Sequence, residues 1–195
     1  MQDALIFLFQ SLLELYILTF VLRLILQAVR ADFRNPVSQF VLKVTDPLIL
    51  PLRRVVPAIG PVDTATVLIA LGLQALLTGV LLNLACTTAP AIPQLLGLSV
   101  IRLVRLTLNI FFFLILAQVI ISWVAAGQYN PMFHLLSQVV EPVLRPFRRL
   151  IPPIAGFDLS PLFAILAIQV FLRLLSGRQL MSGMICSNFV QMQLL

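Results

Sequence analysis

The sequence predicts an all-α, polytopic membrane protein with four transmembrane helices, arranged as two parallel helix-elbow-helix repeats that include short interfacial amphipathic helices. Composition is the first reason: 61% of the residues are hydrophobic and 10% are charged, and the mean hydropathy is +1.07, whereas an ordinary soluble domain is roughly 25% charged. The second reason is a set of four long apolar stretches. The third is a polar segment, here called an elbow, that occurs twice.

The four apolar stretches cover residues 4–29, 62–86, 99–126 and 157–175. A transmembrane helix needs roughly 20 mostly apolar residues, so each stretch is a candidate span. The connector TTAPAIPQLLG lies between the second and third stretches, and its prolines and glycine favour the end of one helix and the start of the next. Asp3 stands where a secretory signal would carry Lys or Arg, so we expect the first helix to be retained.

The elbow repeats without a gap. DPLILPLRRVVPAIGPVDTATVLIALGLQ, residues 46–74, aligns with EPVLRPFRRLIPPIAGFDLSPLFAILAIQ, residues 141–169, at an offset of 95 (141 − 46 = 95). An internal duplication explains such self-similarity. It divides the chain into a first repeat at 1–90, a second repeat at 91–175 and a C-terminal tail at 176–195. Because each repeat holds two spans, both repeats enter the membrane from the same side.

Each elbow is predicted to begin with a short amphipathic helix. Asn35 and Pro36 form a helix start, since Asn caps well and Pro suits the first helical position. Val37, Phe40 and Val41 then fall on one face, at a spacing that is typical of an amphipathic helix. About ten residues are too few to span a bilayer, so we expect these helices to lie flat at the interface with the apolar face toward lipid. Pro47 and Pro142 are expected to end them.

Arginines and two aspartates complete the elbows. Guanidinium groups pair well with phosphate, so the arginines are predicted to contact anionic lipid headgroups. The excess of Arg and Lys in the two long loops places both elbows on the cytoplasmic side of the inner membrane, which puts the N-terminus and the C-terminus in the periplasm. The aspartates are predicted N-caps of the following spans. The predicted headgroup contacts are Arg53, Arg54, Arg145, Arg148 and Arg149, and the predicted caps are Asp63 and Asp158.

Polar residues also interrupt the spans. Glu14 is near the middle of the first span, where an ionisable group is costly and is by default a candidate for function. A Glu14–Arg105 contact between the first and third spans is feasible, because Glu14 corresponds in depth to Asn109, one turn from Arg105. Two interpretations remain open for these residues: interhelical hydrogen bonds that hold the repeats together, or the lining of a transport path. The candidates are Glu14, Gln74, Arg105, Asn109 and Gln169. Arg23 is expected to snorkel toward the cytoplasmic surface.

The inventory of reactive residues favours a protein that is not an enzyme. His134 is the only histidine, and no second ligand or nucleophile is spaced to act with it. We therefore predict no catalytic residue, no metal site and no cofactor. The cations are dispersed along the chain and not gathered in one basic domain, which argues against a nucleic-acid partner. The expected partners are anionic membrane lipids, together with further copies of the chain or other membrane proteins.

The elbow segments PLRRVVPAIGPVD and PFRRLIPPIAGFDLSP, with ELYILTFVLRLILQ and NPVSQFVLKVTDP, resemble the YggT family of small integral membrane proteins, called YlmG in cyanobacteria and plastids. The resemblance covers roughly residues 1–175. The second elbow is closer to the family pattern, because Leu50 stands where the second copy has Arg145.

This resemblance implies a non-enzymatic inner-membrane protein that supports osmotic-shock tolerance or the organisation of membrane proteins. Alternatives are a potassium transporter or channel subunit, and an assembly or division factor. It carries over no catalytic residues.

Overall fold

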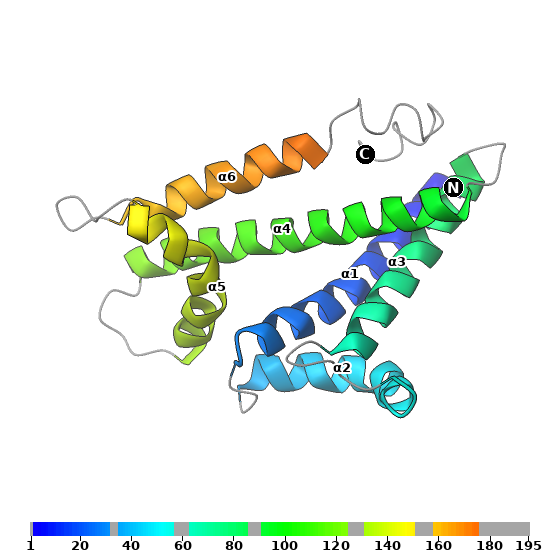
Figure 1. Cartoon of the computed structure of the whole chain (residues 1–195), viewed down its shortest axis with the longest axis horizontal. Coiled ribbons are helices and arrows are strands. Elements are labelled where there is room, and N and C mark those ends of the chain that lie inside the picture. Colours follow the sequence, from blue (N-terminus) through cyan, green and yellow to red (C-terminus); the bar gives the residue numbers. More distant parts are fainter. Residues whose placement is uncertain are drawn as a thin grey trace.

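The computed structural model describes residues 2–31, 35–56, 63–85, 91–124, 131–150 and 158–175. These residues form six helices and no strands, which confirms the all-α class (Figure 1). The predicted tail, 176–195, lies outside the described residues. The helices are α1 (Gln2–Ala28), α2 (Pro36–Arg53), α3 (Thr64–Ala85), α4 (Ile92–Val124), α5 (Pro131–Leu150) and α6 (Ser160–Leu175).

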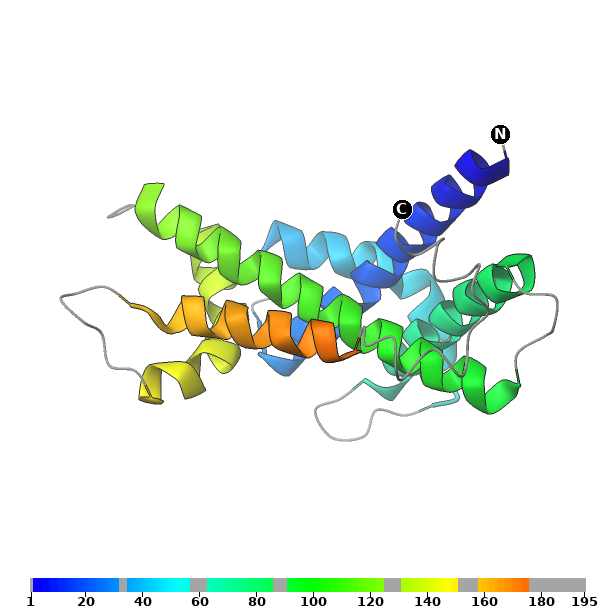
Figure 2. The same ribbon diagram turned by 90° about the horizontal axis from the view of Figure 1, so that it is seen from above.

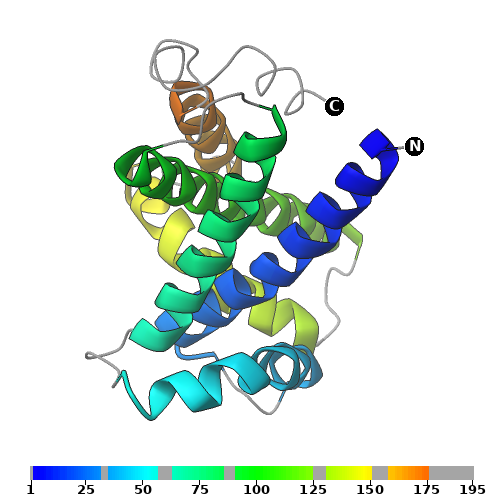
Figure 3. The same cartoon turned by 90° about the vertical axis from the view of Figure 1, so that its right-hand side faces the viewer.

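The helices pack in two groups of three. α1 contacts α2 and α3, while α4 contacts α5 and α6, and the two groups meet where α4 packs against α3 and α1. Figure 1 shows α4 and α6 running side by side, and Figure 3 shows α1 and α3 crossing α4. The elbow helices α2 and α5 lie at the ends of the long helices that are remote from the start of α1, the end of α3 and the start of α4.

Three helices are long and apolar enough to cross a membrane: Ala4–Ala28, Thr64–Leu84 and Ile92–Ser122. α6 is shorter, with 16 residues, and so is about 24 Å long, against a hydrocarbon core of about 30 Å. The apolar helices make this a membrane protein. The four-span arrangement stays a prediction.

The start of α4 corrects the prediction for the connector. We expected the third span to begin near residue 99, but the helix already begins at Ile92 and takes in Pro93 and Gly97. Pro93 is in the first turn, where a backbone amide has no helical partner in any case. The Ala91 amide donates to Gln94 Oε1 at 3.4 Å, the backward contact of a capping box. Local capping therefore starts the helix within the predicted connector.

The elbow helices are also longer than predicted. Pro47 and Pro142 were expected to end them, and that prediction was wrong: α2 continues through Pro47 and Pro51, and α5 through Pro142 and Pro146. In each helix the two prolines are four residues apart, which puts them on one face, and all four are exposed. The carbonyls that lose their donors thus face outward, where water or headgroups can satisfy them. The helix axes bend instead of ending (Figure 2).

Three clusters of buried side chains hold the helices together. One joins α1, α2 and α3 around Phe20 and Ile49, and a second joins α4, α5 and α6 around Ile115 and Leu144. All four of these side chains are fully buried. At the offset of 95, Phe20 aligns with Ile115 and Ile49 with Leu144. The third and largest cluster draws residues from α1 to α5 and joins the two groups.

Candidate functional sites at the elbow helices and within the bundle

The start of α2 is as the sequence predicted. Asn35 Oδ1 accepts from the Val37 amide at 3.0 Å, and Pro36 is the first helical residue. The face that α2 buries differs from the prediction, however. Ser38, Val41, Thr45 and Ile49 are buried against the bundle, whereas Phe40, predicted on the same face as Val41, is 63% exposed. The helix α2 therefore packs one row of side chains against the bundle, and part of its apolar surface stays exposed.

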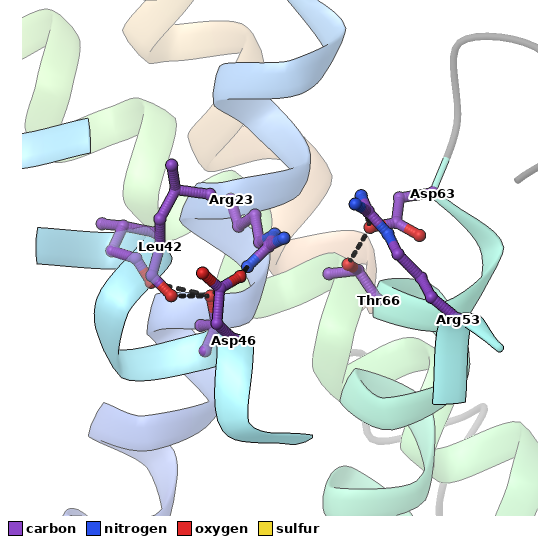
Figure 4. A network of polar contacts seen from close by, with 8 residues as sticks. Arg23, Leu42, Asp46, Arg53, Asp63 and Thr66 are labelled. Atoms are coloured by element: carbon purple, nitrogen blue, oxygen red, sulfur yellow. Dashed lines mark hydrogen bonds and ion pairs between the residues drawn. The ribbon is translucent and has the colours of Figure 1, made fainter. Parts of the chain in front are cut away.

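Arg23 of α1 ends in a buried contact with α2. Its side chain is 3% exposed, and Nη1 donates to Thr45 Oγ1 at 2.7 Å and to Asp46 Oδ1 at 2.6 Å (Figure 4). Thr45 Oγ1 in turn donates to the Val41 carbonyl at 2.7 Å. Arg23, which was expected to snorkel toward the cytoplasmic surface, extends to the elbow helix, where its partner is the partly exposed Asp46. This contact fixes α2 across the end of the first span.

A second contact ties the far end of α2 to the start of α3. Arg53 Nη2 lies 2.6 Å from Asp63 Oδ2, which also accepts from Thr66 Oγ1 at 2.7 Å (Figure 4). Burial raises the pKa of Asp63, but the hydrogen bonds from Arg53 and Thr66 and the Arg53 charge outweigh it, so the pKa lies below its usual value. Asp63 directly precedes α3, the N-cap position that the sequence predicted, and its carboxylate binds side chains there.

The second elbow makes the corresponding contact. Arg148 Nε donates to Asp158 Oδ2 at 2.9 Å, and Arg148 Nη1 donates to Glu141 Oε2 at 2.5 Å. Asp158 Oδ1 accepts from the Ser160 amide at 2.9 Å, which satisfies an N-terminal amide of α6 as predicted. Burial raises the pKa of Asp158, but the hydrogen bonds from Ser160 and Arg148 and the Arg148 charge outweigh it, so the pKa lies below its usual value. Aligned residues, Arg53 with Arg148 and Asp63 with Asp158, therefore form the same ion pair.

The five elbow arginines now fall into two kinds. Arg53 and Arg148 bind carboxylates of the protein, which the sequence did not predict. Arg54, Arg145 and Arg149 are exposed, and no carboxylate of the described residues forms an ion pair with them. Large apolar side chains are exposed on the same two elbows: Val37, Phe40, Leu48, Leu50, Val55 and Leu150.

Inside the bundle, polar residues line a cavity of about 200 Å³ between α1, α3 and α4. Arg102 Nη2 lies 3.8 Å from Glu14 Oε1, and Glu14 Oε1 accepts from Gln10 Nε2 at 3.1 Å. Arg102 Nη1 also reaches Thr78 Oγ1 at 3.3 Å. The lining residues are Gln10, Glu14, Gln74, Arg102, Arg105, Leu106 and Asn109. Four of the five predicted intramembrane residues thus meet in one place.

The ion-pair partner of Glu14 is Arg102, where the sequence suggested Arg105. The two arginines are three residues apart on α4 and so share a face. Sequence spacing identifies that face of α4. It does not give the shift of α1 along its axis against α4, and this shift decides whether Arg102 or Arg105 contacts Glu14.

Gln169 lies in a neighbouring cavity of about 280 Å³ on the α6 side of α4, with Arg105, Asn109 and Arg173. Gln74 and Gln169 therefore line different cavities, and Arg105 and Asn109 of α4 line both. His134 is exposed on α5. Among the described residues, no three His, Cys, Asp or Glu side chains gather as metal ligands would.

Comparison with known proteins shows which family the chain resembles. The model of the CCB3/YggT family matches residues 2–85 and 97–179. An uncharacterized protein of Pseudomonas aeruginosa is 43% identical over 94% of both chains, and the uncharacterized protein YggT of Escherichia coli K12 is 40% identical over 87% of both. No solved structure matches. The chain belongs to the CCB3/YggT family of proteins.

Proposed function

We propose that this chain is a non-enzymatic protein of the inner membrane whose two elbow helices rest on the anionic cytoplasmic leaflet. There it organises membrane or partner proteins and so supports tolerance of osmotic shock. One observation carries the proposal: exposed arginines and exposed apolar side chains occur together on helices that ion pairs join to the ends of the spans.

The energetics favour this placement. Each cation near an anionic leaflet contributes about 1 kcal/mol, so Arg54, Arg145 and Arg149 together contribute about 3 kcal/mol. Val55 is 78% exposed and Leu150 is 77% exposed, and burying such a side chain among acyl chains adds roughly 1.5–3 kcal/mol. Since Arg53 and Arg148 bind Asp63 and Asp158, the elbows are held in place before any lipid binds, which lowers the entropic cost of docking.

An internal duplication would put both elbows on one leaflet. Support comes from the family match, whose two segments begin at residues 2 and 97, the same offset as the repeated elbow. The recurring pairs Arg53–Asp63 and Arg148–Asp158 support it as well. If each repeat contributes two spans, both elbows face the cytoplasm.

The lipid contact can be tested by reconstituting the protein in nanodiscs of phosphatidylcholine with and without phosphatidylglycerol. We expect phosphatidylglycerol to raise the unfolding midpoint of the wild type. The triple variant Arg54→Gln, Arg145→Gln, Arg149→Gln should lose most of that increase. Arg173→Gln removes an exposed cation from α6 and serves as the matched control. An equal response of the triple variant and the wild type would refute headgroup binding by the elbows.

The physiological part needs a separate readout. An Escherichia coli strain that lacks its own YggT, complemented with wild type or triple variant, would be grown after a hyperosmotic shift. We expect the wild type to restore growth and the triple variant to fail at equal membrane abundance. Full restoration by the triple variant would mean that any osmotic role is independent of the elbows.

Potassium transport is the alternative, and the charge of the cavity disfavours it. Glu14 shares that cavity with Arg102 and Arg105, so two fixed cations face one carboxylate, and a potassium ion would meet net repulsion. Potassium flux into liposomes that contain the purified protein would decide. Selective flux abolished by Glu14→Ala would favour transport over the organising role.

A further inference from the structure

We propose that an apolar crevice between the two groups of helices binds one anionic diacyl phospholipid of the leaflet on which the elbows rest. The crevice consists of two neighbouring cavities that share Leu103, Thr107 and Phe111 of α4. The inference rests on the proposed placement of the elbows and adds a defined site to it, with a place for the acyl chains and a place for the phosphate group.

The crevice has room for acyl chains. The larger cavity, of about 400 Å³, is lined by residues of α1, α3, α4 and α5, and the smaller one, of about 360 Å³, by residues of α4, α5 and α6. An apolar cavity of about 150 Å³ is already large enough to bind benzene. Each cavity can therefore hold a segment of an acyl chain, and a diacyl lipid has one place for each of its chains.

Water is a poor occupant of this crevice. Among the described residues that line the two cavities, Thr107 is the only one with a polar side chain, and its Oγ1 already donates to the Leu103 carbonyl at 2.8 Å. A buried water needs about two to four hydrogen-bonding partners, which apolar side chains cannot supply. Ala28, Val67 and Pro142 line the larger cavity and are exposed. The cavity thus opens at the surface of the helices, where acyl chains of the membrane can enter it.

A cation lies next to the crevice. Pro142 lines the larger cavity and Val143 the smaller one, and Arg145 is three residues beyond Pro142, on the same face of α5. Arg145 is exposed, and its side chain forms no ion pair or hydrogen bond within the described part of the chain. Its guanidinium can therefore pair with a lipid phosphate. The first elbow has Leu50 at the aligned position, and no described residue of α2 lines either cavity, so the additional arginine and the crevice occur on the same elbow.

A contact between the two groups holds this arrangement together. Figure 1 shows α5 and the last turns of α1 on the same side of α4. Gln138, one turn before Pro142, donates through Nε2 to the carbonyl oxygens of Val29 at 3.3 Å and Arg30 at 3.4 Å. Val29 itself lines the larger cavity. Because this contact joins α5 to the end of α1, Arg145 keeps its place beside the opening of the crevice.

The site can be tested with phosphatidylglycerol that carries a diazirine in one acyl chain. The full-length protein in phosphatidylcholine nanodiscs with a small fraction of this probe would be irradiated, and the labelled peptides would be identified by mass spectrometry. We expect labelling of α4 around Leu103, Thr107 and Phe111. Replacing part of the phosphatidylcholine by unlabelled phosphatidylglycerol, at constant probe, should suppress it. Labelling of the exposed face of α6, around Leu166 and Val170, should not change, because any lipid can contact that face. An equal response of α4 and α6 would overturn the proposal.

Four variants sharpen the test. Ala28→Phe places a ring in the larger cavity and should abolish the labelling of α4 that phosphatidylglycerol suppresses. Ala4→Phe makes the same change at an exposed residue of the other end of α1 and should keep that labelling. Arg145→Gln should lower the preference for phosphatidylglycerol about fivefold, the effect of one cation near an anionic headgroup, whereas Arg54→Gln on the first elbow should not. The proposal is contradicted if Arg145→Gln behaves like Arg54→Gln, or if Ala28→Phe behaves like Ala4→Phe. Should Ala28→Phe fail to fold, the comparison of the two arginine variants decides.

Failure of this site and failure of the proposed function give different results. Ala28→Phe blocks the crevice alone, so phosphatidylglycerol should still raise its unfolding midpoint in nanodiscs through Arg54 and Arg149. A rise in the midpoint of the wild type without suppressible labelling of α4 refutes the site and leaves the proposed role of the elbows standing. Absence of both responses refutes both.

Discussion

Arg23 Nη1 lies 2.6 Å from Asp46 Oδ1, and the two side chains differ sharply in exposure: 3% for Arg23 and 38% for Asp46. One end of this ion pair is thus inside the bundle and the other is near its surface. The contact joins the first span to the first elbow, so the position of α2 depends on it.

This asymmetry predicts unequal costs for removing the two partners. Asp46→Asn leaves a buried guanidinium without a counter-charge, and breaking a buried pair in this way typically costs 3–5 kcal/mol. Arg23→Gln leaves a carboxylate that can turn to solvent, so we expect a cost of about 1–2 kcal/mol. Denaturation of the two variants in mixed micelles, followed by circular dichroism, measures the difference.

The second group of helices shows which residues stand in place of the Arg23–Asp46 pair. At the aligned positions it has Gln118 and Glu141, and Glu141 binds Arg148 of its own helix. The double variant Arg23→Gln, Asp46→Asn should therefore be closer in stability to Arg23→Gln than to Asp46→Asn. Equal costs for the two single variants would contradict the role assigned to burial.

The lowered pKa of Asp63 predicts acid sensitivity of the first elbow. Its carboxylate is more acidic in the folded protein than the usual 3.8. The stabilisation is therefore complete above about pH 4 and is lost as the pH falls below 3.8 through the lower folded-state pKa. Asp63→Asn should reduce stability at pH 7 and flatten its decline between pH 4 and pH 2.5. Thermal unfolding across this range tests it, and a variant that declines as steeply as the wild type would rule out the linkage.

Much of this fold could be predicted from the sequence because its signals are local. The length of the apolar stretches predicted the long helices, and Asn35 with Pro36 predicted the start of α2. Asp63 and Asp158 lie where helices begin, as predicted. The repeated elbow pointed to residues that do form matching contacts. These features depend on composition and on neighbours a few residues apart, which a single sequence records directly.

The features that were missed depend on the relative placement of helices. Prolines usually end a helix, but here those of α2 and α5 are exposed, so water or headgroups can reach the freed carbonyls. The pairing of Arg23 with Asp46 was not predicted, because the two residues are on different helices. Likewise, the choice between Arg102 and Arg105 for Glu14 is set by the height of α1 against α4. The periodicity of apolar residues predicts which face of a helix is buried, but it does not predict how far the helix is shifted along its axis against its neighbours.

Arg30 offers a test of backbone strain at the end of α1. Its φ is 51°, in the left-handed region, and the bonds Ala31 N to Leu26 O at 2.9 Å and Arg30 N to Gln27 O at 3.1 Å complete a Schellman motif. Because glycine adopts this conformation without strain, Arg30→Gly should stabilise the protein by roughly 0.5–1 kcal/mol. Arg30→Val should destabilise it. Unfolding midpoints in detergent give both values, and a destabilised glycine variant would mean that the Arg30 side chain makes a compensating contact.

The prolines of α2 predict a change in shape. Pro47→Ala with Pro51→Ala restores two backbone amides, so the bent helix should straighten. Spin labels at K43C and R54C, with Cys86 and Cys186 replaced by serine, report the distance along the helix. We expect a longer distance in the alanine variant, approaching about 16 Å between backbones for eleven residues of straight helix. An unchanged distance would show that packing of the stripe Ser38, Val41, Thr45 and Ile49 on the spans, and not the prolines, sets the bend. Because a straight α2 would carry Arg53 away from Asp63, the same variant should also lose the acid sensitivity that depends on their contact.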